Sequence, residues 1–159
     1  MALSTGMPDT DDYIPAADLA RGVLRLMHAR DYAGVTEMTL ANSRRADVAA
    51  LGPSGEIEIV EIKSSVADFQ SDQKWPEYAP FCDRFYFAVA AAFPAQLIPE
   101  HCGLIVADGF GGAVIRHPET HKLAPARRKA MTQKFARLAA LRLAAASGQL
   151  DPAAAFTTF

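Results

Sequence analysis

Residues 45–63 set the topology of the predicted sheet, because their sequence, RADVAALGPSGEIEIVEIK, predicts two strands joined by a tight turn. Residues 53–55 (Pro-Ser-Gly) suit a three-residue hairpin loop, with proline at the first turn position and glycine where φ must be positive. This loop places Asp47 of the first strand directly opposite Glu61 of the second. Directly opposed residues share a face of the sheet, with Cβ atoms roughly 4.5–5.5 Å apart.

Two carboxylates at that separation repel each other, so the pair requires a proton, a basic neighbour or a divalent cation. Lys63 lies two residues beyond Glu61 and therefore shares its face. Converging carboxylates are hard ligands that suit Mg²⁺ or Mn²⁺. A neighbouring lysine can orient a metal-activated water for in-line attack on a phosphodiester. The segment thus predicts a catalytic metal site made by Asp47, Glu61 and Lys63.

A different interpretation of the same strand remains open at this point. A strand that reads EIEIVEIK can carry charges on one face for solubility alone, with Glu61 and Lys63 as an ordinary surface pair. A slip of one residue in the register would also move Asp47 and Glu61 to opposite faces.

In the segments before and after this hairpin, hydrophobic periodicity and turn residues predict an alternation of helices and strands. The predicted helices are Ala16–Arg30, Ser64–Phe81 (broken near Pro76) and Ala126–Ala146. The predicted strands are Val35–Ala41, Arg45–Leu51, Glu56–Lys63, Arg84–Ala91 and Gly103–Asp108, with an edge strand at Ala113–His117. The order α-βββ-α-ββ-α predicts an α/β fold, a mixed central sheet flanked by helices.

Composition fits one domain, because the chain has 159 residues and half of them are apolar. We expect a domain over residues 13–147, a disordered tail at 1–12 and a loose C-terminal tail at 148–159. Two cysteines make no disulfide framework, and no apolar run is long enough for a bilayer, so we expect a cytoplasmic protein with no membrane partner.

The charge is distributed unevenly along the chain. The net charge of −2 argues against a strong non-specific coat of nucleic acid. From Lys122 to Leu150, however, there is no acid and there are seven bases. A solvated basic helix and a phosphate-binding helix explain this run equally well. The candidate phosphate contacts in it are Arg127, Arg128, Lys129 and Lys134.

Asp47 followed by Glu61, Ile62 and Lys63 resembles the D-(x)n-E-x-K core of the PD-(D/E)XK nuclease superfamily. The longer stretch from Arg44 to Val89 is similar to the MmcB family of bacterial DNA repair proteins, which is assigned to that superfamily. The resemblance covers the chain from about residue 17 to residue 143. It implies a restriction-endonuclease-like core and DNA as the partner.

Carried over residue by residue, the resemblance makes Asp47 and Glu61 ligands of Mg²⁺ or Mn²⁺, and the backbone carbonyl of Ile62 a third ligand. Lys63 would act on the nucleophilic water. Many relatives add an acid from the first helix, where this chain has only Asp18 near the start. Glu37 is the candidate substitute.

Residues of the next segment are candidates for binding the substrate. Some superfamily exonucleases carry Q-x-x-x-Y after E-x-K, and Lys74 and Tyr78 have that spacing, which places both on one face of an α-helix. Trp75 can stack on a base or pack the helix onto the sheet, and packing is favoured. Arg45 can neutralise the carboxylates or bind a phosphate.

Acids of the same segment have a simpler role. Asp68 and Asp72 are expected to cap or flank helices rather than to lie near the metal.

These observations leave two main hypotheses. The first is a metal-dependent DNA nuclease in DNA repair. The second is a catalytically weak or inactive nuclease-fold protein that binds DNA or a protein partner. A purely structural α/β protein with solvated acids is a third. A domain this small rarely encloses duplex DNA alone, which allows a homodimer, although nothing in the sequence shows an interface.

Overall fold

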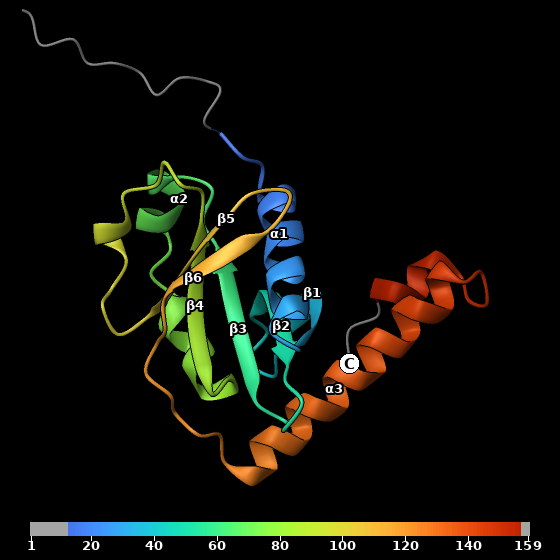
Figure 1. Cartoon of the computed structure of the whole chain (residues 1–159). Helices are drawn as coiled ribbons and strands as arrows, with labels where there is room; N and C mark the ends of the chain where they lie inside the picture. Colours follow the sequence, from blue (N-terminus) through green and yellow to red (C-terminus); the bar gives the residue numbers. More distant parts are fainter. Residues whose placement is uncertain (1–12, 157–159) are drawn as a thin grey trace, which may run out of the picture.

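Six strands form one mixed sheet in the computed structural model, which describes residues 13–156 (Figure 1). The strands are β1 Ala33–Thr39, β2 Arg45–Leu51, β3 Ile57–Ile62, β4 Arg84–Val89, β5 Gly103–Ala107 and β6 Gly112–Arg116. They lie side by side in sequence order. The pairs β3–β4 and β4–β5 are parallel, and the other three pairs are antiparallel.

Helices of two kinds connect and flank these strands. The α-helices are α1 Ala16–Ala29, α2 Val66–Ser71 and α3 Pro125–Ala146, and the 3₁₀ helices are η2 Trp75–Phe81, η3 Ala95–Leu97 and η4 Pro152–Phe156. The mixed α/β architecture predicted from the sequence is confirmed. The edge strand expected at residues 113–117 is β6.

The helix predicted over residues 64–81 is two short pieces. Helix α2 ends at Ser71, and η2 begins only at Trp75. Pro76 and Pro80 lie inside η2 and supply no N–H, which disfavours a continuous α-helix. Lys74 therefore precedes a 3₁₀ helix, and the expected α-helical face shared by Lys74 and Tyr78 does not form.

The sheet has an apolar core on each face. On one face α1 packs Leu19, Val23 and Met27 against a cluster that includes Val60 and Tyr86. On the other face the cover consists of η2 and α3, which contribute Tyr78, Phe81, Met131 and Leu138. Strand β3 is buried along its whole length, so every charged side chain on it needs a partner inside the protein.

Two buried acids are neutralised by arginines within this framework. Glu58 of β3 is fully buried, and Arg30 donates to its two carboxylate oxygens at 2.8 and 3.1 Å. Arg84 lies 3.3 Å from the same carboxylate. This ion-pair cluster ties α1 to the centre of the sheet.

Asp83 forms the second cluster and anchors the start of α3. Its carboxylate accepts backbone N–H groups from Ile57 and Leu123, at 2.8 and 2.9 Å. Arg128 donates to both carboxylate oxygens at 2.8 and 2.6 Å. Burial alone would raise the pKa of Asp83, but these hydrogen bonds outweigh it and lower the pKa to about 2.

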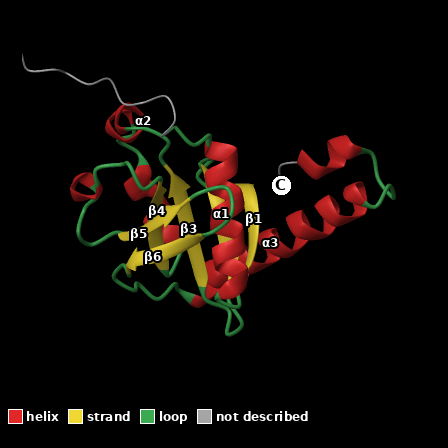
Figure 2. Cartoon of the chain, turned by 45° about the horizontal axis from the view of Figure 1, so that its top comes forward, coloured by secondary structure: helices red, strands yellow, loops and turns green. Residues whose placement is uncertain are grey.

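The C-terminal end of α3 extends past the edge strand β1. Figure 2 shows it extending away from the body of the molecule, with η4 folded back against it. Leu143 on this part is 68% exposed. Residue ranges 1–12 and 157–159, which include the predicted N-terminal tail, lie outside the described residues. Within residues 13–156, no helix is both long and apolar enough to cross a membrane.

Candidate metal centre

The hairpin between β2 and β3 has the predicted register. Gly52 donates its N–H to the carbonyl of Glu56 at 2.8 Å, and Gly55 has a φ of +90°. Leu51 pairs with Ile57, and the pairing continues in step. The tight Pro-Ser-Gly turn thus sets the alignment of β2 and β3 as far as Asp47 and Glu61.

Asp47 and Glu61 meet where β2 and β3 separate. The last backbone pair is Val48 with Val60. Beyond it, the N–H of Asp47 donates to the Oε1 atom of Glu61 at 3.1 Å, and the N–H of Ile62 donates to the Oδ2 atom of Asp47 at 2.8 Å. Each carboxylate therefore replaces a backbone acceptor of the sheet, and both are held in the gap between the strands.

The surroundings of this pair disfavour two negative charges. Burial, and next the charge of Asp47, raise the pKa of Glu61 to about 8. Burial also raises the pKa of Asp47, although the N–H of Ile62 and the charge of Lys63 act in the opposite direction. At neutral pH the pair therefore retains a proton, and a cation would compete with that proton for the site.

Lys63 lies beside the pair and is held by Asp72. Its Nζ atom donates to the Oδ2 atom of Asp72 at 2.7 Å, and its side chain is only 7% exposed. The hydrogen bond from Lys63 lowers the pKa of Asp72, although burial alone would raise it. The sequence suggested a capping role for Asp72. It does accept the N–H of Lys74, but its link to Lys63 was missed.

A pocket of about 710 Å³ opens onto these residues and is called the acidic pocket below. Its lining comes from α1, β1, β2, β3, the start of α2 and η2: Ala16, Ala17, Ala20, Thr36, Glu37, Arg45, Asp47, Glu61, Ile62, Lys63, Asp68 and Tyr78. Helix α1 contributes only alanines to this lining. No acid of this helix is among the residues that line the pocket.

The donor set suits a hard cation that keeps part of its water shell. Among the described residues, no three or more His, Cys, Asp or Glu side chains are placed so that together they could hold a metal ion, so a cation here would rest on two carboxylates. Mg²⁺ is commonly bound through one or two carboxylates, with waters and substrate phosphates completing the coordination. Asp47 and Glu61, with the carbonyl of Ile62 as a third oxygen, match that requirement.

Two further predicted residues line the acidic pocket. Arg45 is at its exposed rim, and the Nη2 atom of Arg45 is 3.8 Å from the Oε1 atom of Glu37. Tyr78 is buried, and its hydroxyl donates to the carbonyl of Arg45 at 2.9 Å. Burial raises the pKa of Tyr78, and the charges of Glu61 and Asp47 raise it further. The phenol of Tyr78 therefore stays uncharged where it lines the acidic pocket.

Lys74 and Trp75 lie apart from the acidic pocket. Lys74 is exposed ahead of η2. Trp75 packs against Phe85 and Phe87, with ring centroids 5.8 and 5.5 Å apart, so it takes the packing role that the sequence favoured.

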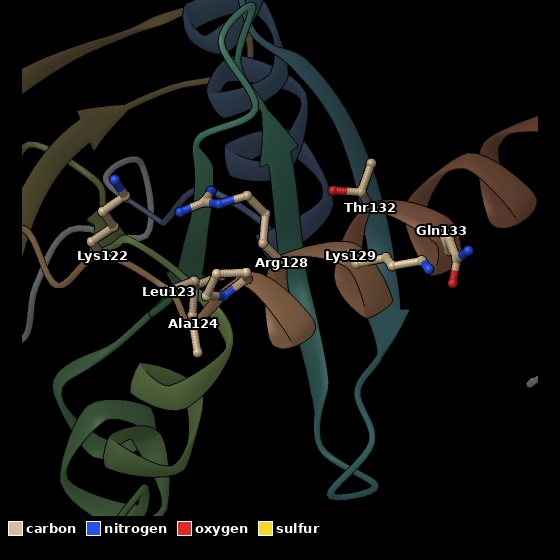
Figure 3. A pocket seen from close by; sticks show the side chains of 8 residues that line it. Lys122, Leu123, Ala124, Arg128, Lys129, Thr132 and Gln133 are labelled. Atoms are coloured by element: carbon tan, nitrogen blue, oxygen red, sulfur yellow. The ribbon is translucent and has the colours of Figure 1, made fainter.

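The candidate phosphate contacts on α3 differ in how far they are engaged with the protein. The guanidinium of Arg127 lies 4.4 Å from the ring centre of Phe81, and Arg128 is bound to Asp83. Lys129 is exposed, and Lys134 is half-buried. Figure 3 shows Arg128 and Lys129 on α3, beside a second, open pocket of about 850 Å³. Of the four, Lys129 is the most accessible to a phosphate.

Comparison with known proteins supports the family resemblance. A family model described as DNA repair protein MmcB-like matches residues 6–149. The chain belongs to the MmcB-like family of DNA repair proteins. Membership in this family suggests a role in DNA repair.

One solved structure shares the fold. It is a protein of unknown function from Silicibacter pomeroyi, 47% identical to this chain, with a TM-score of 0.83. The match covers 89% of this chain and 95% of that one. No curated protein matches the chain.

Proposed function

We propose that this MmcB-like protein is a DNA nuclease that depends on Mg²⁺ or Mn²⁺, with the restriction-endonuclease-like core of the PD-(D/E)XK superfamily. The observation that carries the proposal is the opposed pair Asp47 and Glu61. Both carboxylates are held by backbone N–H groups at the same pocket, and the pKa of Glu61 is raised to about 8. A buried pair that disfavours its second negative charge is a place where a divalent cation gains from binding.

Asp47 and Glu61 would hold the ion, with the carbonyl of Ile62 as a further ligand, while Glu37 lines the pocket without forming a three-acid site with them. A bound Mg²⁺ or Mn²⁺ would stabilise the charge that develops on the phosphodiester and lower the pKa of the attacking water. The hydrogen bonds from the two backbone N–H groups fix the carboxylates before substrate arrives, which reduces the cost of reorganisation.

Lys63 would orient the reacting groups. An ammonium group has three donors, and one of them is directed at Asp72. Another can donate to the attacking water or to a phosphate oxygen. Because Lys63 is buried and tied to the segment between α2 and η2, its position varies little, which favours a defined geometry of attack.

The DNA backbone would approach from the exposed rim. Arg45 lies there, with a side chain that is 64% exposed. Lys129 and Lys134 on α3 are further candidate contacts. The net charge of −2 predicts that sequence-independent binding is modest and sensitive to salt.

The test is cleavage of single-stranded and double-stranded DNA with Mg²⁺ or Mn²⁺. We expect Asp47→Asn and Lys63→Met each to lower the rate by on the order of 10²–10³-fold, because each removes a group that stabilises the transition state. Leu143→Ala, at an exposed position on α3, is the control and should cleave like the wild type. Equal cleavage by the wild type and both variants would reject the proposal, because it would indicate a contaminant.

A second candidate function is favoured by α1. Its residues at the acidic pocket are Ala16, Ala17 and Ala20. A nuclease fold whose first helix presents no acid to the pocket could serve as a DNA-binding or partner-binding protein with little activity. Calorimetric titration with Mn²⁺ discriminates the two functions. Absence of Mn²⁺ binding, together with salt-sensitive DNA binding, would favour this second function.

A further inference from the structure

Glu37 occupies an irregular position inside strand β1. The pairs Thr36–Val48 and Met38–Ala46 flank it on either side, while its own φ is +51°. This left-handed conformation is uncommon for residues other than glycine, asparagine and aspartate. A glutamate held in it within a strand indicates that the surrounding structure imposes the conformation.

In both β1 and β2, the regular alternation of side chains between the two faces of the sheet is interrupted at this point. Val35 and Met38 pack in the same core, on the face covered by α3. Residues three apart in a regular strand point to opposite faces. Ala46 and Ala49 of β2 show the same departure. The left-handed turn at Glu37 is therefore where the alternation of β1 shifts by one residue.

Arg142 on α3 holds this turn from outside the sheet. Its guanidinium donates to the carbonyl of Thr36 and, at 3.4 Å, to the carbonyl of Glu37. Its Nε atom donates to the carbonyl of Ala155 at 3.5 Å. Consecutive carbonyls of a regular strand point in opposite directions within the sheet. The left-handed turn allows one guanidinium to reach both.

The turn decides where the Glu37 carboxylate lies. Glu37 lines the acidic pocket together with Asp47 and Glu61. Acids of three neighbouring strands thus occupy the same level of the sheet. The side chain of Glu37 is 53% exposed and lies 3.8 Å from the guanidinium of Arg45, so little packing holds it and the backbone turn sets the direction in which it leaves the strand.

We propose that Arg142 is a positioning residue for the acidic pocket. By holding the left-handed turn, it keeps the Glu37 carboxylate at the rim of the pocket that Asp47 and Glu61 line, where its charge would attract a cation to that pair. The effect of Glu37 on a bound cation rests on the proposed function. The hold of Arg142 on the turn does not, and the two are tested separately.

Amide hydrogen exchange at residues 36–39 tests the hold on the turn. We expect Arg142→Ala to speed exchange there by about tenfold, because local opening no longer breaks two hydrogen bonds. Arg142→Lys should give a smaller increase, since an ammonium does not reproduce the planar fork of a guanidinium. Leu143→Ala, next to it on α3, should leave exchange unchanged. Equal exchange in the wild type and Arg142→Ala would overturn the inference.

Titration with Mn²⁺ tests the consequence for the pocket. We expect Glu37→Gln and Arg142→Ala each to weaken Mn²⁺ binding by about tenfold, the low end of the range for groups that act on a metal site from beyond its ligands. The double variant should bind no more weakly than Glu37→Gln alone, because Arg142 acts through Glu37. Additive losses, or unchanged binding in Arg142→Ala, would overturn the role of Arg142.

The same experiments separate the inference from the proposed function. If the wild type binds no Mn²⁺, the proposed metal centre fails, and with it the effect of Glu37 on metal binding. Exchange at residues 36–39 would still decide whether Arg142 holds the turn. A circular dichroism spectrum of each variant verifies that the fold is retained.

Discussion

Strand β3 carries two buried glutamates, three residues apart, with opposite surroundings. Glu58 is fully buried, and its carboxylate forms ion pairs with both Arg30 and Arg84. Glu61 is also buried, but the neighbouring charge with the largest effect on its pKa is that of another acid, Asp47. One strand thus holds one acid that is neutralised by the protein and one that is not.

The comparison shows how a buried carboxylate can be assigned to stability or to function. Asp83, like Glu58, has arginine as its partner, and hydrogen bonds lower its pKa to about 2. The pKa of Glu61 is raised to about 8, because burial and Asp47 both disfavour its charge. An acid whose charge the protein does not balance is a candidate for an external cation or proton.

The largest expected effect is on catalysis. We expect Glu61→Gln to lower Mg²⁺-dependent DNA cleavage by on the order of 10²–10³-fold, because it removes a proposed ligand. Glu58→Gln, the same substitution on the same strand, should keep the activity per folded molecule. Cleavage rates normalised to the folded fraction make this comparison. If the two variants lost activity equally, the division between the two glutamates would be wrong.

Stability should respond in the opposite way. Glu58→Gln leaves Arg30 and Arg84 without their carboxylate and should cost about 3 kcal/mol of the free energy of unfolding. The lower end of the range for buried pairs applies, because both arginines reach solvent. Urea unfolding measures the change. A cost under ~1 kcal/mol would show that the ion pairs of Glu58 do not stabilise the fold.

The pH dependence of stability separates the acids further. Because the pKa of Glu61 is raised from 4.5 to about 8, its contribution to stability is full below pH 4.5 and is lost as the pH rises through 8. One pKa unit corresponds to about 1.36 kcal/mol, so we expect the metal-free protein to lose more than ~1 kcal/mol between pH 5 and 9.

Urea unfolding in EDTA measures this loss, and Glu61→Gln should abolish most of it. Asp83 behaves in the opposite sense, since its pKa is lowered from 3.8 to about 2. Its contribution is present above pH 3.8 and is lost as the pH falls toward 2. A wild-type stability that is flat from pH 5 to 9 would contradict the raised pKa of Glu61.

The smallest expected effect concerns DNA binding by α3. Lys129 is exposed, so Lys129→Ala should weaken binding similarly for all sequences and reduce the slope of log K against log salt by about 1. Arg128→Gln should change this slope less, because Arg128 is already paired with Asp83. Fluorescence anisotropy at several salt concentrations measures the slope for each variant. Equal slopes for Lys129→Ala and Arg128→Gln would show that the ion pair with Asp83 does not keep Arg128 from binding phosphate.

Local chemistry made part of this structure predictable from the sequence. The Pro-Ser-Gly turn and the period of two fixed the register of β2 and β3, and with it the approach of Asp47 to Glu61. The mixed α/β fold followed from the alternation of helices and strands. The weak point was the segment before β4, where Pro76 and Pro80 turned an expected α-helix into a 3₁₀ helix.

Contacts made by the tertiary structure were not predictable in this way. Asp72 binds Lys63 because α2 ends at Ser71 and the chain turns back there. Arg142 reaches β1 only because α3 runs across that edge of the sheet. The left-handed turn at Glu37 has no signal in the sequence, since glutamate does not favour that conformation.

The metal site itself can be tested by crystallography with Mn²⁺. Crystals of the wild type soaked in Mn²⁺ should show an anomalous peak between the carboxylates of Asp47 and Glu61, and crystals of Glu61→Gln treated in the same way should lack it. A wild-type crystal with both carboxylates accessible and no peak between them, or with the ion bound elsewhere, would contradict the account.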